Sequence, residues 1–243
     1  MRVHVPALAQ DEVHVWRIPL DVEAPPGGVL WQTLATGERA RAAAFLVDAA
    51  RRRYVVARGA LRSILAGYLA SDPGAVPIAT GPFGKPGLVP GASTQDLRFN
   101  LSHSGELALC AVAVGREVGI DVERMHGGRD LTAIAERFFS PPEAAALRAT
   151  DEGRRARAFF KYWTRKEAFV KARGLGLLMP LDQFSVSLEP DLGDVALAAT
   201  NGQAVLAWSL HALEADPGYV AALGVEGRPL RIVNCSWGGP GAC

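Results

Sequence analysis

Two carboxylates stand two residues apart in the segment VGIDVE, residues 118–123. The surrounding apolar residues are typical of a β-strand, and side chains alternate between the two faces of a strand, so Asp121 and Glu123 are expected on one face. Two such carboxylates repel each other unless a cation lies between them, and hard oxygen ligands suit Mg²⁺ or Mn²⁺ better than zinc. The pattern alone leaves open a divalent-metal site or an ordinary solvated strand face.

A second group of charged residues lies in FFKYWTRKEAFVKA, residues 159–172, within a helix predicted over residues 154–173. Glu167 and Lys171 stand one helical turn apart, an arrangement that fits a catalytic site but also a surface ion pair worth about 0.2–0.5 kcal/mol. Lys166 falls instead on the side of the helix that carries the aromatic residues. Its ammonium group must therefore reach solvent or meet an anion.

Basic and polar residues upstream have the chemistry of a phosphate site. The segment NLSHSG, residues 100–105, places Ser102 and His103 at a corner between two predicted strands, and GKP places Lys85 in a turn. Residues 37–68 carry several guanidinium groups, whose planar donors match phosphate oxygens: Arg39, Arg41, Arg51, Arg52, Arg53, Arg58 and Arg62. Each of these residues also has an ordinary interpretation as a solvated surface group.

These residues must be positioned by a mixture of helices and short strands. The periodicity predicts two helices within residues 37–68 and further helices over 130–139, 142–148 and 154–173, with Ser140 as an N-cap. Strands are predicted over residues 13–18, 118–123, 184–188, 196–199, 204–210, 219–225 and 230–234, with two more within 97–114, as in an antiparallel sheet. Because helices precede strands in each half, we expect an α+β protein with a boundary near residue 115.

Composition excludes several classes of function. The chain has 243 residues with 26 basic and 25 acidic side chains, so a bulk nucleic-acid binder is not expected. Residues 195–213 contain no charged side chain, but Asn201-Gly202 predicts a hairpin turn within them, so we expect no membrane span. Asp11 and Glu12 interrupt the apolar core that a signal peptide needs, and the three cysteines show no CxxC spacing. A cytoplasmic location is therefore expected.

Taken together and in this order, the motifs resemble those of the surfactin-type (Sfp-like) 4′-phosphopantetheinyl transferases. The match consists of VGID at 118–121 followed by Glu123, FFSPPE at 138–143, and WTRKEAFVKARGLGL at 163–177. The upstream segments RRRYVVARGALRSIL, FGKPGL and NLSHSG resemble the coenzyme A-binding segments of that family. The resemblance spans roughly residues 37–177 and is less distinct over residues 1–36 and 178–243.

The resemblance implies transfer of 4′-phosphopantetheine from coenzyme A to a serine of an apo acyl or peptidyl carrier protein, with release of 3′,5′-ADP. It does not choose among carriers of nonribosomal peptide, polyketide or fatty-acid type. The implied fold is a pseudodimer of two similar α/β halves in one chain, with coenzyme A in the cleft between them. Residues 1–115 would bind the coenzyme A phosphates and residues 116–243 would bind metal and catalyse. A monomer is implied, because one chain contains both halves.

The resemblance also assigns roles to individual residues. It implies that Mg²⁺, or Mn²⁺ in its place, binds to Asp121, Glu123 and Glu167. Glu167 or a metal-bound water would take the proton of the serine, and Lys171 would neutralise or protonate the departing phosphate. The residues implied to hold coenzyme A phosphates are Arg53, Lys85, Ser102, His103 (at the 3′-phosphate) and, by a looser alignment, Arg39. Glu143 and Trp163 also match motif positions and are interpreted as supporting groups.

Two other functions compete with this interpretation. A non-catalytic regulatory protein could bind coenzyme A or a carrier protein without turnover, but the loss of Asp121 or Glu167 that would favour it has not occurred. A nucleotide pyrophosphatase would also use Mg²⁺, but the sequence lacks a Walker A loop. Three arginines before the signature helix are left open as contacts to an acidic carrier surface or as solvated groups: Arg154, Arg155 and Arg157.

Overall fold

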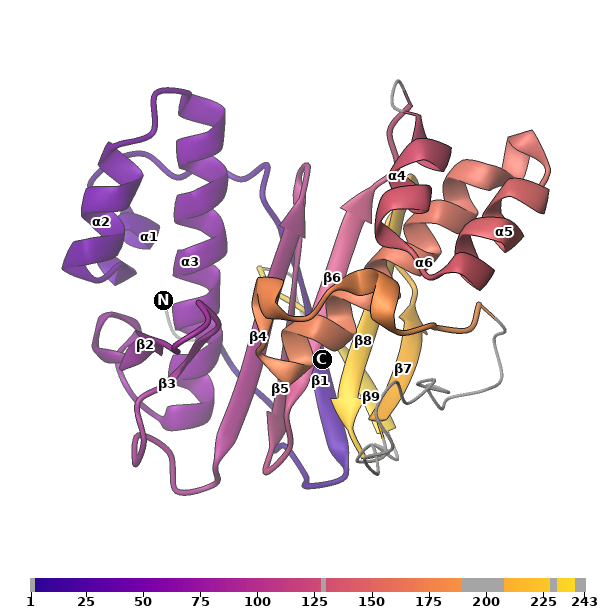
Figure 1. Ribbon diagram of the computed structural model, residues 1–243. Coiled ribbons are helices and arrows are strands. Elements are labelled where there is room, and N and C mark those ends of the chain that lie inside the picture. The colour runs from indigo at the N-terminus through magenta and orange to yellow at the C-terminus, as the bar shows by residue number, and fades with distance from the viewer. Residues whose placement is uncertain (1–2, 128–129, 189–207, 228–230, 239–243) are drawn as a thin grey trace. The chain divides into compact units, whose positions relative to one another are not determined.

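The computed structural model describes residues 3–127, 130–188, 208–227 and 231–238 (Figure 1). The chain divides into two compact units. The first comprises residues 1–79, 86–115 and 231–243, and the second comprises residues 80–85 and 116–230. The first unit therefore takes up a segment from the end of the chain, a connection that the sequence pattern did not indicate.

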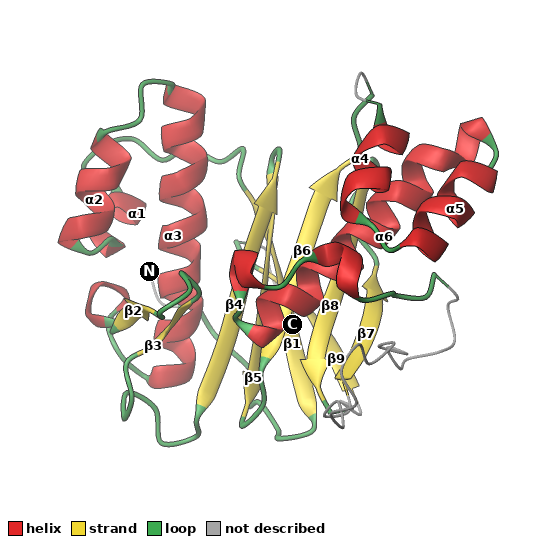
Figure 2. Cartoon of the chain, viewed as in Figure 1, coloured by secondary structure: helices red, strands yellow, loops and turns green. Residues whose placement is uncertain are grey.

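The first unit contains a four-stranded sheet with the strand order β4-β5-β1-β9 (Figure 2). Its strands are β1 (Glu12–Pro19), β4 (Leu97–Ser104), β5 (Leu107–Val114) and β9 (Arg231–Ser236). The first three pair antiparallel, as expected, but β9 pairs parallel to β1. The expectation of a purely antiparallel sheet is thus wrong at β9. Parallel neighbours need a long crossover, and here nearly the whole chain separates the two strands.

Three helices and a short 3₁₀ turn complete the first unit: α1 (Val29–Thr33), α2 (Thr36–Ala43), α3 (Asp48–Leu69) and η1 (Pro73–Ala75). The apolar side of α3 packs on the sheet, where Leu61 and Ile64 share a buried core with Trp16, Phe99 and Val112. The two helices predicted within residues 37–68 are confirmed. The short helix α1 was not predicted, because it follows directly on a loop rich in proline and glycine.

Several arginines of α3 have structural partners. Glu38 of α2 forms ion pairs with both Arg58 and Arg62, and Arg62 is only 3% exposed. Arg62 also donates to the carbonyl oxygens of Pro73 and Val76. Arg58 and Arg62 therefore anchor α2 and the η1 turn to α3.

A short two-stranded ladder consists of β2 (Ile78–Thr80) and β3 (Pro86–Leu88). These are the short extended pieces expected for a segment rich in glycine and proline. The connection between them, residues 81–85, belongs to the second unit and carries Lys85.

The second unit contains a three-stranded antiparallel sheet in the order β6-β8-β7. Its elements are β6 (Val118–Arg124), α4 (Leu131–Phe138), α5 (Pro141–Ala149), α6 (Glu152–Arg173), η2 (Gly176–Leu178), η3 (Leu181–Gln183), β7 (Trp208–Leu213) and β8 (Tyr219–Glu226). Helix α5 begins at the predicted N-cap Ser140, whose hydroxyl group and backbone N–H both donate to Glu143. This reciprocal capping fixes the start of the helix.

The strand predicted over residues 184–188 is not present. Phe184 and Val186 are buried, as a strand pattern requires, but their backbone groups bind side chains rather than a neighbouring strand. The N–H of Val186 donates to Glu143, and the carbonyl oxygen of Phe184 accepts from Lys166. The hairpin predicted at Asn201-Gly202 and the strand predicted over 196–199 lie outside the described residues.

The two units share one order of core elements, to which the first unit adds β9 and the β2–β3 ladder. In each, one strand precedes two shorter helices and a 22-residue helix (α3 or α6), and an antiparallel hairpin follows. The strand orders correspond, since β4-β5-β1 in the first unit matches β7-β8-β6 in the second. This confirms the α+β class and the mixture of elements expected from the sequence. Among the residues described, no helix is both long and apolar enough to span a membrane.

Candidate active site

Two glycines bring α6 directly onto the sheet of the second unit. Gly119 of β6 is paired in register with Gly224 of β8. A Cβ atom on Gly119 would lie 2.1 Å from the carbonyl oxygen of Ala168, and one on Gly224 would lie 3.1 Å from the same atom. Glycine at these positions removes the side chains that would hold the helix away. As a result α6 packs closely on the two strands beside the acidic residues of β6.

This close packing pairs Asp121 with Lys171. Asp121 follows Gly119 by two residues on β6, and its Oδ1 atom lies 2.6 Å from Nζ of Lys171 on α6. The Asp121 side chain is 4% exposed, so the interpretation of this carboxylate as a solvated strand residue is wrong. A buried carboxylate needs a positive partner, and the lysine supplies one.

The remaining carboxylates of the set lie within electrostatic reach. Burial raises the pKa of Glu167, and the negative charges of Asp121 and Glu123 raise it further, whereas Lys171 lowers it. The charges of the three predicted metal ligands therefore affect one another, and among them stands one positive partner, Lys171. Oxygen donors with excess negative charge are the ligands that Mg²⁺ prefers, so the residues present fit such an ion. Within the described ranges, however, no three acidic, histidine or cysteine side chains are already gathered as a metal site.

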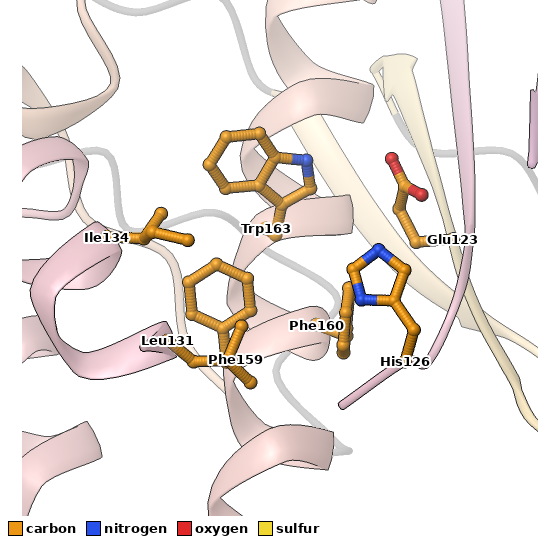
Figure 3. A pocket seen from close by; sticks show the side chains of 7 residues that line it. All are labelled: Glu123, His126, Leu131, Ile134, Phe159, Phe160 and Trp163. Atoms are coloured by element: carbon orange, nitrogen blue, oxygen red, sulfur yellow. The ribbon is translucent and has the colours of Figure 1, made fainter. Parts of the chain in front are cut away.

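A pocket of about 130 Å³ opens beside Glu123 (Figure 3). Glu123 and His126 line one side, and the other walls are apolar and come from α4 and α6: Leu131, Ile134, Phe159, Phe160 and Trp163. The ring of His126 packs edge-on against Phe160 at 5.6 Å, and Trp163 stacks on Phe159 at 5.8 Å. The pocket thus joins an apolar wall to one of the predicted metal ligands.

Lys166 meets an anion, one of the two outcomes expected from its place among aromatic residues. Its ammonium group is fully buried, lies 2.7 Å from Glu143, and also donates to the carbonyl oxygens of Leu181 and Phe184. Glu143 in turn accepts from the N–H of Val186 at 2.7 Å. This buried pair fixes α5 and the segment after η3 against α6, one residue before Glu167.

Lys85 is held within the second unit. Its ammonium group donates to Glu117 at 2.7 Å and to the carbonyl oxygens of Val118 and Ala172, both at 3.1 Å. These three contacts account for all three donors of the group. Lys85 therefore ties the loop between β2 and β3 to the start of β6 and the end of α6.

The other predicted phosphate residues lie in the first unit. Arg53 of α3 donates through Nε to Glu106 at 3.0 Å, and Glu106 lies in the turn between β4 and β5. Ser102 and His103 precede that turn on β4, the first buried and the second exposed. The ion pair thus brings Arg53 to the hairpin that carries both residues. Arg39 is half-buried on α2 and has no side-chain hydrogen bond or ion pair to the described residues.

Comparison with known proteins places this arrangement in a family. A family model described as the 4′-phosphopantetheinyl transferase superfamily matches residues 117–224, which run from the start of β6 into β8. The 4′-phosphopantetheinyl transferase HetI of Nostoc sp. is 43% identical over 220 residues, covering 90% of each chain. The chain belongs to the 4′-phosphopantetheinyl transferase superfamily.

Two further relatives show lower sequence identity to this chain. The 4′-phosphopantetheinyl transferase Sfp of Bacillus subtilis is 34% identical over 164 residues, which cover 67% of this chain and 69% of Sfp. A putative 4′-phosphopantetheinyl transferase of Synechocystis sp. is 32% identical over 201 residues, covering 79% and 80% of the two chains. The family expected from the sequence motifs is therefore confirmed.

Sequence reasoning missed the glycines that position the site of this superfamily member. A glycine inside a strand pattern signals close approach of another backbone, and Gly119 and Gly224 both have that signature. Ala168 and Ala172, one turn apart on α6, are the matching small residues. His126 and the apolar pocket were also missed, because the pocket is lined by a strand, a loop and two helices that are separated in sequence.

Proposed function

We propose that this chain transfers the 4′-phosphopantetheine group from coenzyme A to a serine of an apo acyl or peptidyl carrier protein and releases 3′,5′-ADP. The observation that carries the proposal is the 2.6 Å pair of Asp121 with Lys171 beside the crowded carboxylate of Glu167. It lies within the residues matched to the 4′-phosphopantetheinyl transferase superfamily. HetI and Sfp, which are related to this chain along much of its length, carry the same transferase name.

The three carboxylates Asp121, Glu123 and Glu167 hold a divalent cation, Mg²⁺ or alternatively Mn²⁺. When bound, the cation supplies neutralisation of the negative charge on the pyrophosphate of coenzyme A. The support for this assignment is the donor chemistry and the position of Glu167, whose pKa is raised by burial and then by the negative charges of Asp121 and Glu123. A cation there offsets the repulsion that the lysine alone leaves in place.

Glu167 acts on the attacking serine, and Lys171 acts on the leaving group. The serine oxygen forms a bond to the phosphorus atom next to pantetheine, and the bond from that phosphorus to the bridging oxygen breaks. Glu167, or a water at the cation, would accept the proton of the serine hydroxyl group. Lys171 neutralises or protonates the departing phosphate oxygen of 3′,5′-ADP. Phosphoryl transfer depends mainly on such positioning and charge stabilisation.

The remaining phosphates of coenzyme A bind to basic and polar residues: Arg53, Ser102, His103 and Arg39. Lys85 would join them by exchanging its contact with Glu117 for a phosphate oxygen. We assign this binding mainly to residues 1–115, and metal binding and catalysis to residues 116–243. The common order of core elements in the two units supports a pseudodimer of similar halves. That coenzyme A binds in a cleft between the halves is proposed from the family resemblance. Because one chain would contain both halves, we further propose a monomer. The cytoplasmic location expected from the sequence stays a prediction.

The proposal is tested by measuring 3′,5′-ADP release from coenzyme A with and without an apo carrier domain, in Mg²⁺ and in excess chelator. We expect release that requires both the carrier and the metal. Asp121→Asn should abolish release, whereas Glu136→Gln, at an exposed ion pair with Arg148, should not change it. Release without a carrier would indicate a pyrophosphatase, and coenzyme A binding without release would indicate the regulatory alternative.

A further inference from the structure

One carboxylate and two backbone carbonyl oxygens hold the ammonium group of Lys85. The carboxylate is that of Glu117, whose Oε2 atom lies 2.7 Å from Nζ of the lysine. The carbonyl oxygens are those of Val118 and Ala172, both at 3.1 Å. Ala172 lies in the last turn of α6, where carbonyl groups have no partner within the helix and a cation complements the helix dipole. Backbone therefore fixes two of these contacts, and only the contact with Glu117 depends on a side chain.

The backbone of Glu117 is held independently of its side chain. Its N–H donates to a carboxylate oxygen of Glu226, the last residue of β8, at 3.2 Å. Its carbonyl oxygen accepts from the N–H of the same residue at 2.9 Å. The Glu117 side chain is 35% exposed, whereas that of Lys85 is 19% exposed. The carboxylate can therefore turn into solvent by rotation about its own side-chain bonds, while β6, β8 and α6 keep their places.

The two backbone anchors of Lys85 are close in sequence to the proposed catalytic groups. Val118 begins β6 and precedes Asp121 by three residues, which is about 10 Å along a strand. Ala172 directly follows Lys171 on α6. A ligand with several phosphate groups that binds at Lys171 can therefore also place one of them at Lys85. There it meets the carboxylate of Glu117, and the two anions repel each other.

We propose that Glu117 competes with coenzyme A for Lys85 and thereby sets the affinity for this substrate. The inference rests on the proposed function and adds a residue that determines how tightly coenzyme A binds. An ammonium group has three donors, and Lys85 uses all three, so a phosphate oxygen must replace one acceptor. The replaceable acceptor is the carboxylate, because the other two belong to the backbone. Coenzyme A must offset the loss of this ion pair, which lowers its net affinity.

The test is a calorimetric titration of coenzyme A into the protein, with Mg²⁺ and without a carrier, for the wild type and Glu117→Gln. Glutamine keeps the length of the side chain and an acceptor oxygen but removes the charge. We expect the Kd for coenzyme A to fall by about fivefold, the equivalent of one partly exposed ion pair. The matched control is Glu136→Gln, which removes a carboxylate from an exposed pair with Arg148 in the same unit. It should leave the Kd unchanged.

A second background separates competition for Lys85 from general charge repulsion. In Lys85→Gln the carboxylate has no ammonium group to hold, so the added Glu117→Gln substitution should change the Kd by less than about twofold. An equal gain in both backgrounds would overturn the inference, and so would an unchanged Kd in the single variant Glu117→Gln. Tighter binding of coenzyme A without transfer to any carrier would support the inference and contradict the proposed function. Transfer with an unchanged Kd would do the reverse.

Discussion

Gly119 of β6 and Gly224 of β8 are direct partners in the antiparallel register, and a Cβ atom on either would lie within 3.1 Å of the carbonyl oxygen of Ala168 in α6. Because neither glycine has a side chain, the backbone of α6 packs directly on the backbone of the two strands. Asp121 lies two residues beyond Gly119 on β6. Lys171 lies next to Ala172, whose backbone nitrogen a Cβ atom on Gly119 would also meet. The close contact therefore sets the separation between the strand and the helix that carry the proposed catalytic groups.

We predict that Gly119→Ala destabilises the protein by about 3 kcal/mol, because the new methyl group would meet backbone atoms that cannot move independently of α6. The displaced helix should also lower the rate of transfer by roughly 100-fold. Urea denaturation and steady-state kinetics measure the two effects. The matched control is Gly153→Ala, at a helical glycine of α6 with open space around it, which should be neutral or stabilising by up to about 1 kcal/mol. Equal effects at both positions would contradict the role of close packing.

The buried pair of Lys166 and Glu143 should behave as a coupled unit. Lys166→Met or Glu143→Gln alone removes one partner from a site that is almost completely buried, and we expect each to cost about 3–5 kcal/mol. The double variant should cost clearly less than the sum, because no unpaired charge remains. Denaturant unfolding of the four proteins gives the coupling energy. Additive effects would show that the two charges do not depend on each other.

Glu167→Gln should stabilise the metal-free protein while abolishing transfer. The pKa of Glu167 is raised in the folded state, so its carboxyl group is most favourable to folding below its ordinary value of 4.5 and loses that contribution as pH rises through the folded value. At pH 7.5 the ionised group opposes folding, and glutamine removes on the order of 1 kcal/mol of desolvation and repulsion, or about 2–4 °C in Tm. Calorimetry in chelator checks this result. A lower Tm than that of the wild-type protein would contradict the crowding of carboxylates.

The stability of the first unit should fall in mild acid because of His14. Burial lowers the pKa of this histidine, although hydrogen bonding and charge from Glu12 oppose the shift. The unfolded chain therefore takes up a proton near pH 6.5 before the folded chain does, so the free energy of unfolding decreases as pH falls below that value. Nδ1 of His14 lies 2.7 Å from the hydroxyl group of Tyr68, which accepts from Trp16. We expect His14→Gln to flatten the pH dependence of urea unfolding between about pH 7.5 and 5.5, and an unchanged slope would contradict the assignment.

Long elements with clear periodicity were predictable from the sequence. Helix α6 and strand β6 follow directly from their apolar spacing, and the N-cap at Ser140 was correct. The strand predicted over 184–188 failed because the same alternation of buried residues was satisfied by side-chain partners, with Glu143 and Lys166 in place of a neighbouring strand. The parallel pairing of β9 with β1 could not be predicted, since it joins residues more than 200 positions apart.

The candidate site was predictable in part. The motif order identified Asp121 and Lys171, but the ion pair between them was not predicted, because it depends on the close packing of α6 on β6. An anion beside Lys166 was one of the two outcomes expected, and its identity as Glu143 depends on tertiary packing. The three partners of Lys85 were not foreseen, because two of them are backbone carbonyl groups that carry no sequence signal.

The most direct test of the account is the intact mass of an apo carrier protein after incubation with this protein, coenzyme A and Mg²⁺, beside a chelator control. The account predicts a mass increase equal to one phosphopantetheine group on the carrier serine, which disappears in chelator and with Asp121→Asn. If several unrelated apo carriers keep their original mass while calorimetry shows that the folded protein binds coenzyme A, the transferase function is contradicted.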